Sequence, residues 1–160
     1  MVVSFNYSIN DIFSLYPEYG CFFNDLNLIL PSFNVFILKK WYHNEKQPSK
    51  ADLKANVIYL RKKQMKNKDI GAWLIHEIAH LYFNTNRGAF FNKPYPMNIE
   101  EEFAFSCQFL FLKQKGNDFK QIEPIIQNAY ESGDYTKYKP IFIDYWNTTS
   151  QNKIKNLLCI

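Results

Sequence analysis

Hydrophobic positions recur at helical spacing in a segment in the middle of the chain, residues 70–83. Two adjacent stripes repeat every three or four residues: Ile70, Leu74, Ile78 and Leu81 in one, and Trp73, His76, His80 and Phe83 in the other. A helix that is apolar nearly all round is typically buried. Asp69 stands at the position of an N-cap. We therefore expect a buried helix that begins directly after Asp69.

A second segment of helical period begins at residue 99. Its apolar positions are Ile99, Phe103, Cys107 and Leu110. Asn98 precedes them as a suitable N-cap, and three consecutive glutamates occupy the first turn. A long loop, Asn86 to Met97, connects the two expected helices. This loop could shape one wall of a cleft.

Two runs of β-branched and aromatic residues predict strands upstream of the first helix. Residues 56–63 alternate in character and end in a basic stretch, which is typical of a strand followed by a turn. Residues 33–42 form a second strand candidate, although Ser32 could equally cap a helix there. The small sheet formed by such strands would pack beside the helix of residues 70–83.

The rest of the chain has helical character. The expected helices are Asn10–Tyr16, Asn24–Leu30, Asp118–Ser132, Pro140–Trp146 and Ser150–Leu158. Gly133 would follow the end of the third of these, and Pro140 would occupy the first turn of the fourth. No internal repeat interrupts the chain. We expect an α+β fold, mostly helical with a small β-sheet, in a single domain spanning residues 1–160.

The segment His76-Glu77-Ile78-Ala79-His80 carries the strongest chemical signal. Positions i and i+4 of a helix lie on one face, so His76 and His80 can direct both imidazoles at one zinc ion. Glu77 lies between them and can serve as a base toward water. Chance gives roughly 0.003 such matches in a chain of this composition. Core histidines bonded to the backbone are the alternative, but they leave Glu77 unexplained.

A catalytic zinc ion takes a third protein ligand, and few candidates follow the motif. No histidine follows His80, which excludes a downstream histidine ligand. The second helix instead offers Glu100, Glu101 and Glu102 in its first turn. Carboxylates there also complement the helix dipole, so their position alone selects none of them. Ala104 favours Glu101, because a small residue three positions later lets the two helices approach closely, and Glu102 is the alternative metal ligand.

With these residues the chain resembles the gluzincin peptidases, which bind zinc through both histidines of this motif and a glutamate on a later helix. The resemblance covers about residues 57–111. It implies a zincin-like domain with one zinc ion per chain, bound by His76, His80 and Glu101. It also implies a metalloendopeptidase that hydrolyses peptide bonds, with Glu77 as the general base. In such enzymes a sheet edge next to the metal helix binds the peptide or protein substrate as an added strand.

Three branches of that group compare with this chain: the CAAX-protease type, the ImmA/IrrE type of mobile-element regulators, and the minimal single-domain gluzincins. Glu101 and Ala104 reproduce the Glu-x-x-Ala of the first two. Phe105 stands where these two commonly have Asp or Asn, and Ala79 stands where the ImmA/IrrE type usually has Gly. The alternative functions are a regulatory zincin of a mobile element that acts on one protein partner, and a non-catalytic metal-binding domain.

A further side chain should stabilise the oxyanion that develops during hydrolysis. Tyr138 and Tyr145 are the candidate stabilisers, and Tyr135 and Arg87 are chemically suitable as well. The sequence does not choose among them. His43 is a remote alternative, because it lies far upstream and a polar segment follows it.

Composition and charge narrow the class of protein further. A chain of 160 residues that is 47% hydrophobic can build one globular core, which excludes a disordered or fibrous protein. No apolar stretch approaches the ~18–20 residues that span a bilayer, and residues 1–6 lack the basic region and apolar core expected of a signal sequence. Three widely separated cysteines fit a reducing compartment, so we expect a cytoplasmic protein without a membrane partner.

A net charge of +4 is too modest to indicate nucleic-acid binding. The basic residues are scattered, apart from a cluster within residues 61–68. A solvated turn is the expected role of the Lys62–Lys68 loop, with acidic or phosphate-bearing partners as the alternative. The sequence leaves the oligomeric state open.

Overall fold

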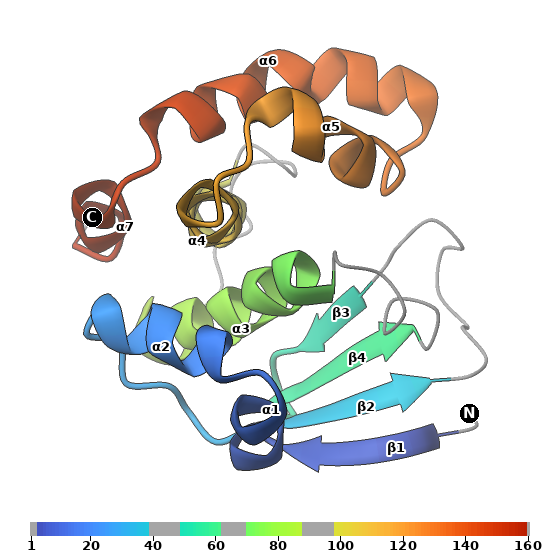
Figure 1. Ribbon diagram of the computed structural model, residues 1–160, viewed down its shortest axis with the longest axis vertical. Helices are drawn as coiled ribbons and strands as arrows, with labels where there is room; N and C mark the ends of the chain where they lie inside the picture. The colour runs from blue at the N-terminus through green and yellow to red at the C-terminus, as the bar shows by residue number, and fades with distance from the viewer. Residues whose placement is uncertain (1–2, 39–48, 62–69, 88–97, 160) are drawn as a thin grey trace.

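The computed structural model describes residues 3–38, 49–61, 70–87 and 98–159 (Figure 1). In chain order the elements of these residues are β1 (Val3–Ser8), α1 (Ile9–Leu15), α2 (Pro17–Asp25), β2 (Asn34–Leu38), β3 (Ser49–Asp52), β4 (Val57–Arg61), α3 (Ile70–Arg87), α4 (Ile99–Gln114), α5 (Phe119–Gln127), α6 (Ser132–Thr148) and α7 (Gln151–Leu157). The expected α+β fold, mostly helical with a small sheet, is confirmed.

The four strands form one mixed sheet in the order β1-β2-β4-β3. β2 and β4 run parallel in its centre, with Val35 opposite Ile58 and Ile37 opposite Leu60. These four side chains are fully buried, whereas Phe36 and Tyr59 alternate with them and are half-buried. Period-two burial of this kind means that one face of the sheet is covered. Helix α3 lies across that face (Figure 1).

The strand predicted at residues 56–63 is confirmed as β4 (Val57–Arg61), which is an inner strand of the sheet. β4 lies between β2 and β3, so it offers no free edge. The edge strand next to α3 is β3, which pairs antiparallel with β4 through Ser49 opposite Leu60. Its sequence, Ser-Lys-Ala-Asp, is polar and lacks the composition of a strand, so backbone pairing with β4 determines it.

Helices α3 and α4 make the most extensive contact between any two elements. Two small residues, Ala79 of α3 and Ala104 of α4, are both fully buried in one hydrophobic cluster that also receives the inner face of the sheet. A second cluster lies on the other side of α4, where Phe105 and Phe109 pack against α5 and α6. α4 therefore lies between two apolar layers, which explains why it is buried on nearly every face.

Two helix predictions near the N-terminus have different outcomes. Asn10–Tyr16 is confirmed as α1 with a shift of one residue. The helix predicted at Asn24–Leu30 is wrong, because α2 begins earlier, with Pro17 in its first turn, and ends at Asp25. Asn27 then adopts a positive φ of 57° and reverses the chain. Leu26 and Leu28 are both buried at a spacing of two residues, which suits this turn better than a helix.

The C-terminal helices begin and end at other residues than the sequence predicted. The helix predicted at Asp118–Ser132 is α5, which starts directly after Asp118 but ends at Gln127 rather than Ser132. α6 begins at Ser132, so Gly133 lies inside it and Pro140 lies in its interior. The side chain of the N-cap residue of α6 makes no capping hydrogen bond to the first turn, which leaves the start of α6 without a sequence signal. Pro140 has no N–H to donate to the helix, which destabilises α6. The burial of aromatic side chains of α6 offsets this loss.

The helix predicted at Ser150–Leu158 is confirmed as α7 (Gln151–Leu157), and the strand predicted within residues 33–42 is confirmed as β2 (Asn34–Leu38). Asp69, His43, the Lys62–Lys68 loop and most of the Asn86–Met97 loop lie outside the described residues. Among the helices that the structure describes, none combines the length and apolar character needed to cross a membrane.

Asn98 caps α4 as predicted, and its Oδ1 accepts a hydrogen bond from the backbone N–H of Glu101 at 2.8 Å. We expect Asn98→Ala to lower the free energy of unfolding by about 1 kcal/mol, because one N–H of the first turn loses its partner. Asn98→Asp is the matched control, since an aspartate caps equally well. Urea denaturation of both variants checks this, and equal losses in both would show that the amide group, not the cap, matters.

Candidate metal centre

Helix α3 places His76 and His80 one turn apart on the same face, as the spacing predicts. Their ring centroids are 4.8 Å apart, and both residues are less than 10% exposed. The His76 ring lies 5.5 Å from that of Trp73 and 4.5 Å from that of Phe105 on α4. Aromatic packing from both helices therefore limits how far the His76 imidazole can turn.

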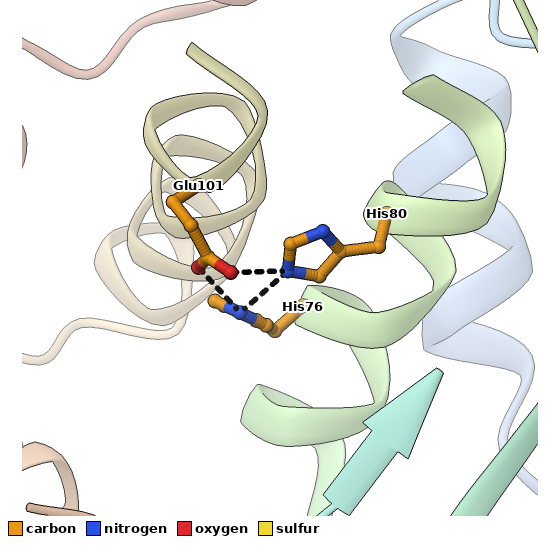
Figure 2. Close-up of side chains that lie close together, drawn as sticks. All are labelled: His76, His80 and Glu101. Carbon is orange, nitrogen blue, oxygen red and sulfur yellow. Dashed lines mark hydrogen bonds and ion pairs between the residues drawn. The ribbon is translucent and has the colours of Figure 1, made fainter. Parts of the chain in front are cut away.

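Glu101, in the first turn of α4, reaches both imidazoles (Figure 2). One carboxylate oxygen lies 3.1 Å from Nε2 of His80, and the other lies 3.4 Å from Nε2 of His76. The two Nε2 atoms are 3.1 Å from each other. Within the described residues, His76, His80 and Glu101 form a group whose ligand atoms all lie within 4.8 Å of one another and could hold a metal ion.

The opposite nitrogen of each ring is also engaged. Nδ1 of His76 lies 3.0 Å from Oε1 of Gln108, and Nδ1 of His80 lies 2.8 Å from Oε1 of Glu100. An amide or carboxylate oxygen accepts hydrogen bonds and donates none, so each Nδ1 carries the hydrogen and donates it. In the neutral rings, both Nε2 atoms consequently keep a lone pair. This is the tautomer in which a metal-binding histidine is held by its outer partner.

The two Nε2 atoms and the Glu101 carboxylate lie close enough together to bind one cation. Two nitrogen lone pairs and a carboxylate meet in a buried place, and they repel one another unless positive charge lies among them. Oε2 of Glu101 is buried and has no hydrogen-bond partner among the described residues. A proton can relieve part of this repulsion, and a divalent ion can accept all three groups at once. Two imidazoles and one carboxylate form a donor set that suits zinc and other transition metals better than magnesium or calcium.

The carboxylates shift the protonation of the metal-free group. Burial alone lowers the pKa of His80, but the nearby carboxylates of Glu101, Glu100 and Glu77 outweigh burial and raise it well above 6.5. Burial likewise raises the pKa of Glu101, yet His80 and His76 lower it to about 2. Without metal, the group therefore holds an ionised Glu101 beside a protonated His80 over a broad pH range.

Glu77 is buried next to the two histidines and does not belong to the group of possible ligands. Its Oε1 accepts a hydrogen bond of 2.8 Å from the hydroxyl of Ser49 on β3. A cavity of about 350 Å³ opens in front of these side chains. Its described lining consists of the candidate ligands, Glu77 and Glu100, residues of β3 and its following turn (Ser49, Lys50, Ala51, Leu53), Trp73, and Ala129. The candidate base and the candidate ligands thus face one shared space.

The other glutamates of the first turn have separate places. Glu100 contacts the Nδ1 side of His80 and supports the ring from behind. Glu102, the alternative metal ligand of the sequence analysis, lies outside the group, with Oε2 3.9 Å from Nζ of Lys153 on α7. Of the three consecutive carboxylates, the structure brings Glu101 to the two Nε2 atoms.

The candidate oxyanion stabilisers are not among the described residues that line the cavity. Tyr145 is buried with its ring stacked on Phe105 at 6.3 Å, and burial raises its pKa strongly, with Glu102 and Glu101 adding to the rise. Tyr138 is half-buried, and its ring lies 6.3 Å from that of Tyr130. The two further candidates are engaged elsewhere: Tyr135 donates to Glu123, and Arg87 donates to the backbone oxygen of Leu158.

Two residues of the site escaped the sequence analysis. Gln108 carried a readable signal, because it is a lone amide in the apolar run of α4 and lies two turns after Glu101 on the same face. A polar residue at such a position needs a buried partner. Ser49 carried no signal, because it follows a polar stretch of sequence and reaches Glu77 only through the fold of the sheet.

Comparison of the chain with models of protein families, with curated proteins and with solved structures finds no match. The geometry of the site therefore carries the functional argument.

The charge pair of the metal-free group predicts a pH dependence of stability. Because the pKa of Glu101 in the folded protein lies below the ordinary 4.5, its carboxylate stabilises the fold above pH 4.5. This stabilisation is lost as the pH falls toward about 2. Because the pKa of His80 in the folded protein lies well above the ordinary 6.5, its protonated ring stabilises the fold below pH 6.5. This stabilisation is lost as the pH rises through the pKa of His80 in the folded protein. We expect Glu101→Gln to lower the free energy of unfolding most between pH 4.5 and 6.5, by on the order of 1–3 kcal/mol.

Urea denaturation with a chelator at about pH 3, 5.5 and 8.5 measures this difference between wild type and Glu101→Gln. Glu102→Gln is the matched control, because its carboxylate lies outside the group, and it should cost less than about 0.5 kcal/mol at each pH. A Glu101→Gln cost that is the same at all three pH values would contradict the proposed charge pair.

Proposed function

We propose that this protein is a zinc-dependent metalloendopeptidase in which His76, His80 and Glu101 hold one zinc ion and Glu77 is the general base. The observation that carries the proposal is the meeting of both Nε2 atoms with the Glu101 carboxylate beside a carboxylate that is not a ligand. A purely structural site has no use for that fourth group. The donor set and the motif spacing support the same choice of metal.

Zinc at this position supplies Lewis acidity, which lowers the pKa of water toward ~7 and polarises a carbonyl. The chain's own residues supply the rest. Glu77 takes a proton from the attacking water and passes it to the leaving amine, which a carboxylate at the cavity wall can do. Gln108 and Glu100 keep the two imidazoles in the tautomer that presents Nε2.

The substrate class that we propose is an extended peptide or protein segment. Among the strands that the structure describes, β3 is an edge strand of the sheet. Residues of β3 line the cavity directly beside Glu77. An edge strand can bind a peptide by main-chain hydrogen bonds, which are independent of the peptide's sequence. The proposed substrate-binding edge is therefore β3 and not β4, the strand predicted at residues 56–63.

We further propose that the protein works in the cytosol. The support comes from its cysteines: Cys21, Cys107 and Cys159 all lie in the described part of the chain, and none of them forms a disulfide bond. Unpaired cysteines are typical of a reducing compartment.

Substitutions of the ligands test the metal site. His76→Ala should abolish stoichiometric zinc, because two remaining ligands do not hold the ion against dialysis. Glu101→Gln should weaken zinc binding most among the three glutamates. Glu100→Gln should weaken it by about 10–100-fold, since it removes the outer partner of His80. Glu102→Gln is the matched control and should change nothing.

Competition with a chromophoric chelator measures these affinities, and metal analysis after dialysis measures the stoichiometry. A His76→Ala variant that retains a full equivalent of zinc would show that the motif is not the metal site. If Glu100→Gln, Glu101→Gln and Glu102→Gln all bind zinc as tightly as the wild type, the third ligand lies elsewhere.

Glu77→Gln tests the reaction. We expect a folded, zinc-loaded variant that cleaves peptides about 10²–10⁴-fold more slowly, because an amide cannot take the proton. The measurement is cleavage of a peptide library by both proteins side by side, with a chelator control. Glu102→Gln is the matched substitution and should retain activity.

Activity that survives in Glu77→Gln would indicate a contaminating protease. A zinc-loaded wild type that cuts nothing in a broad library would contradict a general endopeptidase. It would favour either of the two alternatives, a regulatory zincin with one protein partner or a non-catalytic metal-binding domain.

A further inference from the structure

The hydrogen bond between Ser49 and Glu77 connects the edge strand to the candidate base. The Ser49 hydroxyl donates to Oε1 of Glu77 at 2.8 Å, across 28 positions of sequence. Ser49 is 1% exposed and Glu77 is 7% exposed, so water competes little for this bond. A hydrogen bond to a charged group in such a place is stronger than an ordinary one.

The position of Ser49 is unusual for a hydroxyl. It pairs with Leu60 of β4, and the next inward residue of β3, Ala51, pairs with Ile58. Leu60 and Ile58 are fully buried, so the register puts the Ser49 side chain at an inward position of the sheet, where apolar residues prevail. Glu77 is the partner that satisfies the hydroxyl there.

We propose that Ser49 is a positioning residue that acts through Glu77, an inference that rests on the proposed peptidase function. A glutamate side chain has three rotatable bonds, and without a partner its carboxylate samples several directions. The Ser49 bond fixes Oε1, so that the other oxygen is held for proton transfer at the cavity. Because Ser49 belongs to β3, the strand that would bind the peptide also sets the direction of the base.

Steady-state kinetics test this role in the zinc-loaded protein. Ser49→Ala should lower kcat by about 10-fold and leave KM and zinc affinity within about twofold, because only the orientation of the base is lost. Ser49→Thr keeps the hydroxyl and should restore most of kcat. Ser106→Ala is the matched control and should leave kcat unchanged: this serine is also fully buried, and within the described part of the chain its hydroxyl has no hydrogen-bond partner.

The metal-free protein provides a readout that does not depend on activity. Ser49→Ala should lower Tm by about 2–4 °C when Glu77 is present. In a Glu77→Ala background the same change should have almost no further effect, because the partner of the hydroxyl is gone. Such a double-mutant cycle measures the contact itself.

The outcomes separate this role from the proposed function. A wild type that holds zinc and cleaves no peptide overturns the peptidase function and this role with it. An active wild type whose Ser49→Ala variant keeps full kcat overturns the positioning role alone. Additive shifts in Tm overturn the contact, and a loss in kcat that Ser49→Thr does not restore assigns Ser49 to packing instead.

Discussion

The site depends on one electrostatic constraint: two imidazole nitrogens and a carboxylate share a buried space and require positive charge among them. Each Nδ1 hydrogen is already donated outward, so both Nε2 lone pairs face the same point. Glu101 is drawn to this point and held ionised by the histidines. A proton on His80 satisfies the arrangement in part, whereas a metal ion bonds to all three groups. The same atoms therefore explain both the pH behaviour of the metal-free protein and its capacity for metal.

The packing of α4 holds the two imidazoles and the Glu101 carboxylate close together despite their mutual repulsion. α4 lies between two apolar layers, and Ala104 of α4 is buried in the same cluster as Ala79 of α3. Phe105 illustrates the effect, because its ring packs against His76 at 4.5 Å. Here an aromatic ring restrains the histidine by contact, and Gln108 supplies the hydrogen bond.

The arrangement around Glu77 differs from that around the candidate ligands. The ligands come from two helices and are fixed by side chains of those helices, whereas Glu77 is fixed from the sheet by Ser49. The candidate base is therefore coupled to the strand that borders the cavity, and the metal group is coupled to the helix pair. Substitutions in β3 and in α4 should consequently affect different parts of the chemistry.

The sequence by itself determined the features that depend on local geometry. Helical periodicity put His76 and His80 on one face, and Asn98 located the start of α4 with its carboxylates. These follow from the spacing of residues along a single element. Where local signals were weak or misleading, as at the uncapped start of α6 and at the polar strand β3, the predicted boundaries were wrong or absent.

Only the tertiary structure decided which side chains meet across elements. The contacts of His80 with Glu100, of Glu77 with Ser49, and of His76 with Gln108 join residues 20, 28 and 32 positions apart. Their distances depend on how α4 and β3 pack against α3, and one residue of rotation along α4 would exchange the roles of the three glutamates. Ala104 favoured Glu101 among them, but packing between two apolar layers fixes that rotation, because it is set by the sum of many contacts rather than by any one residue.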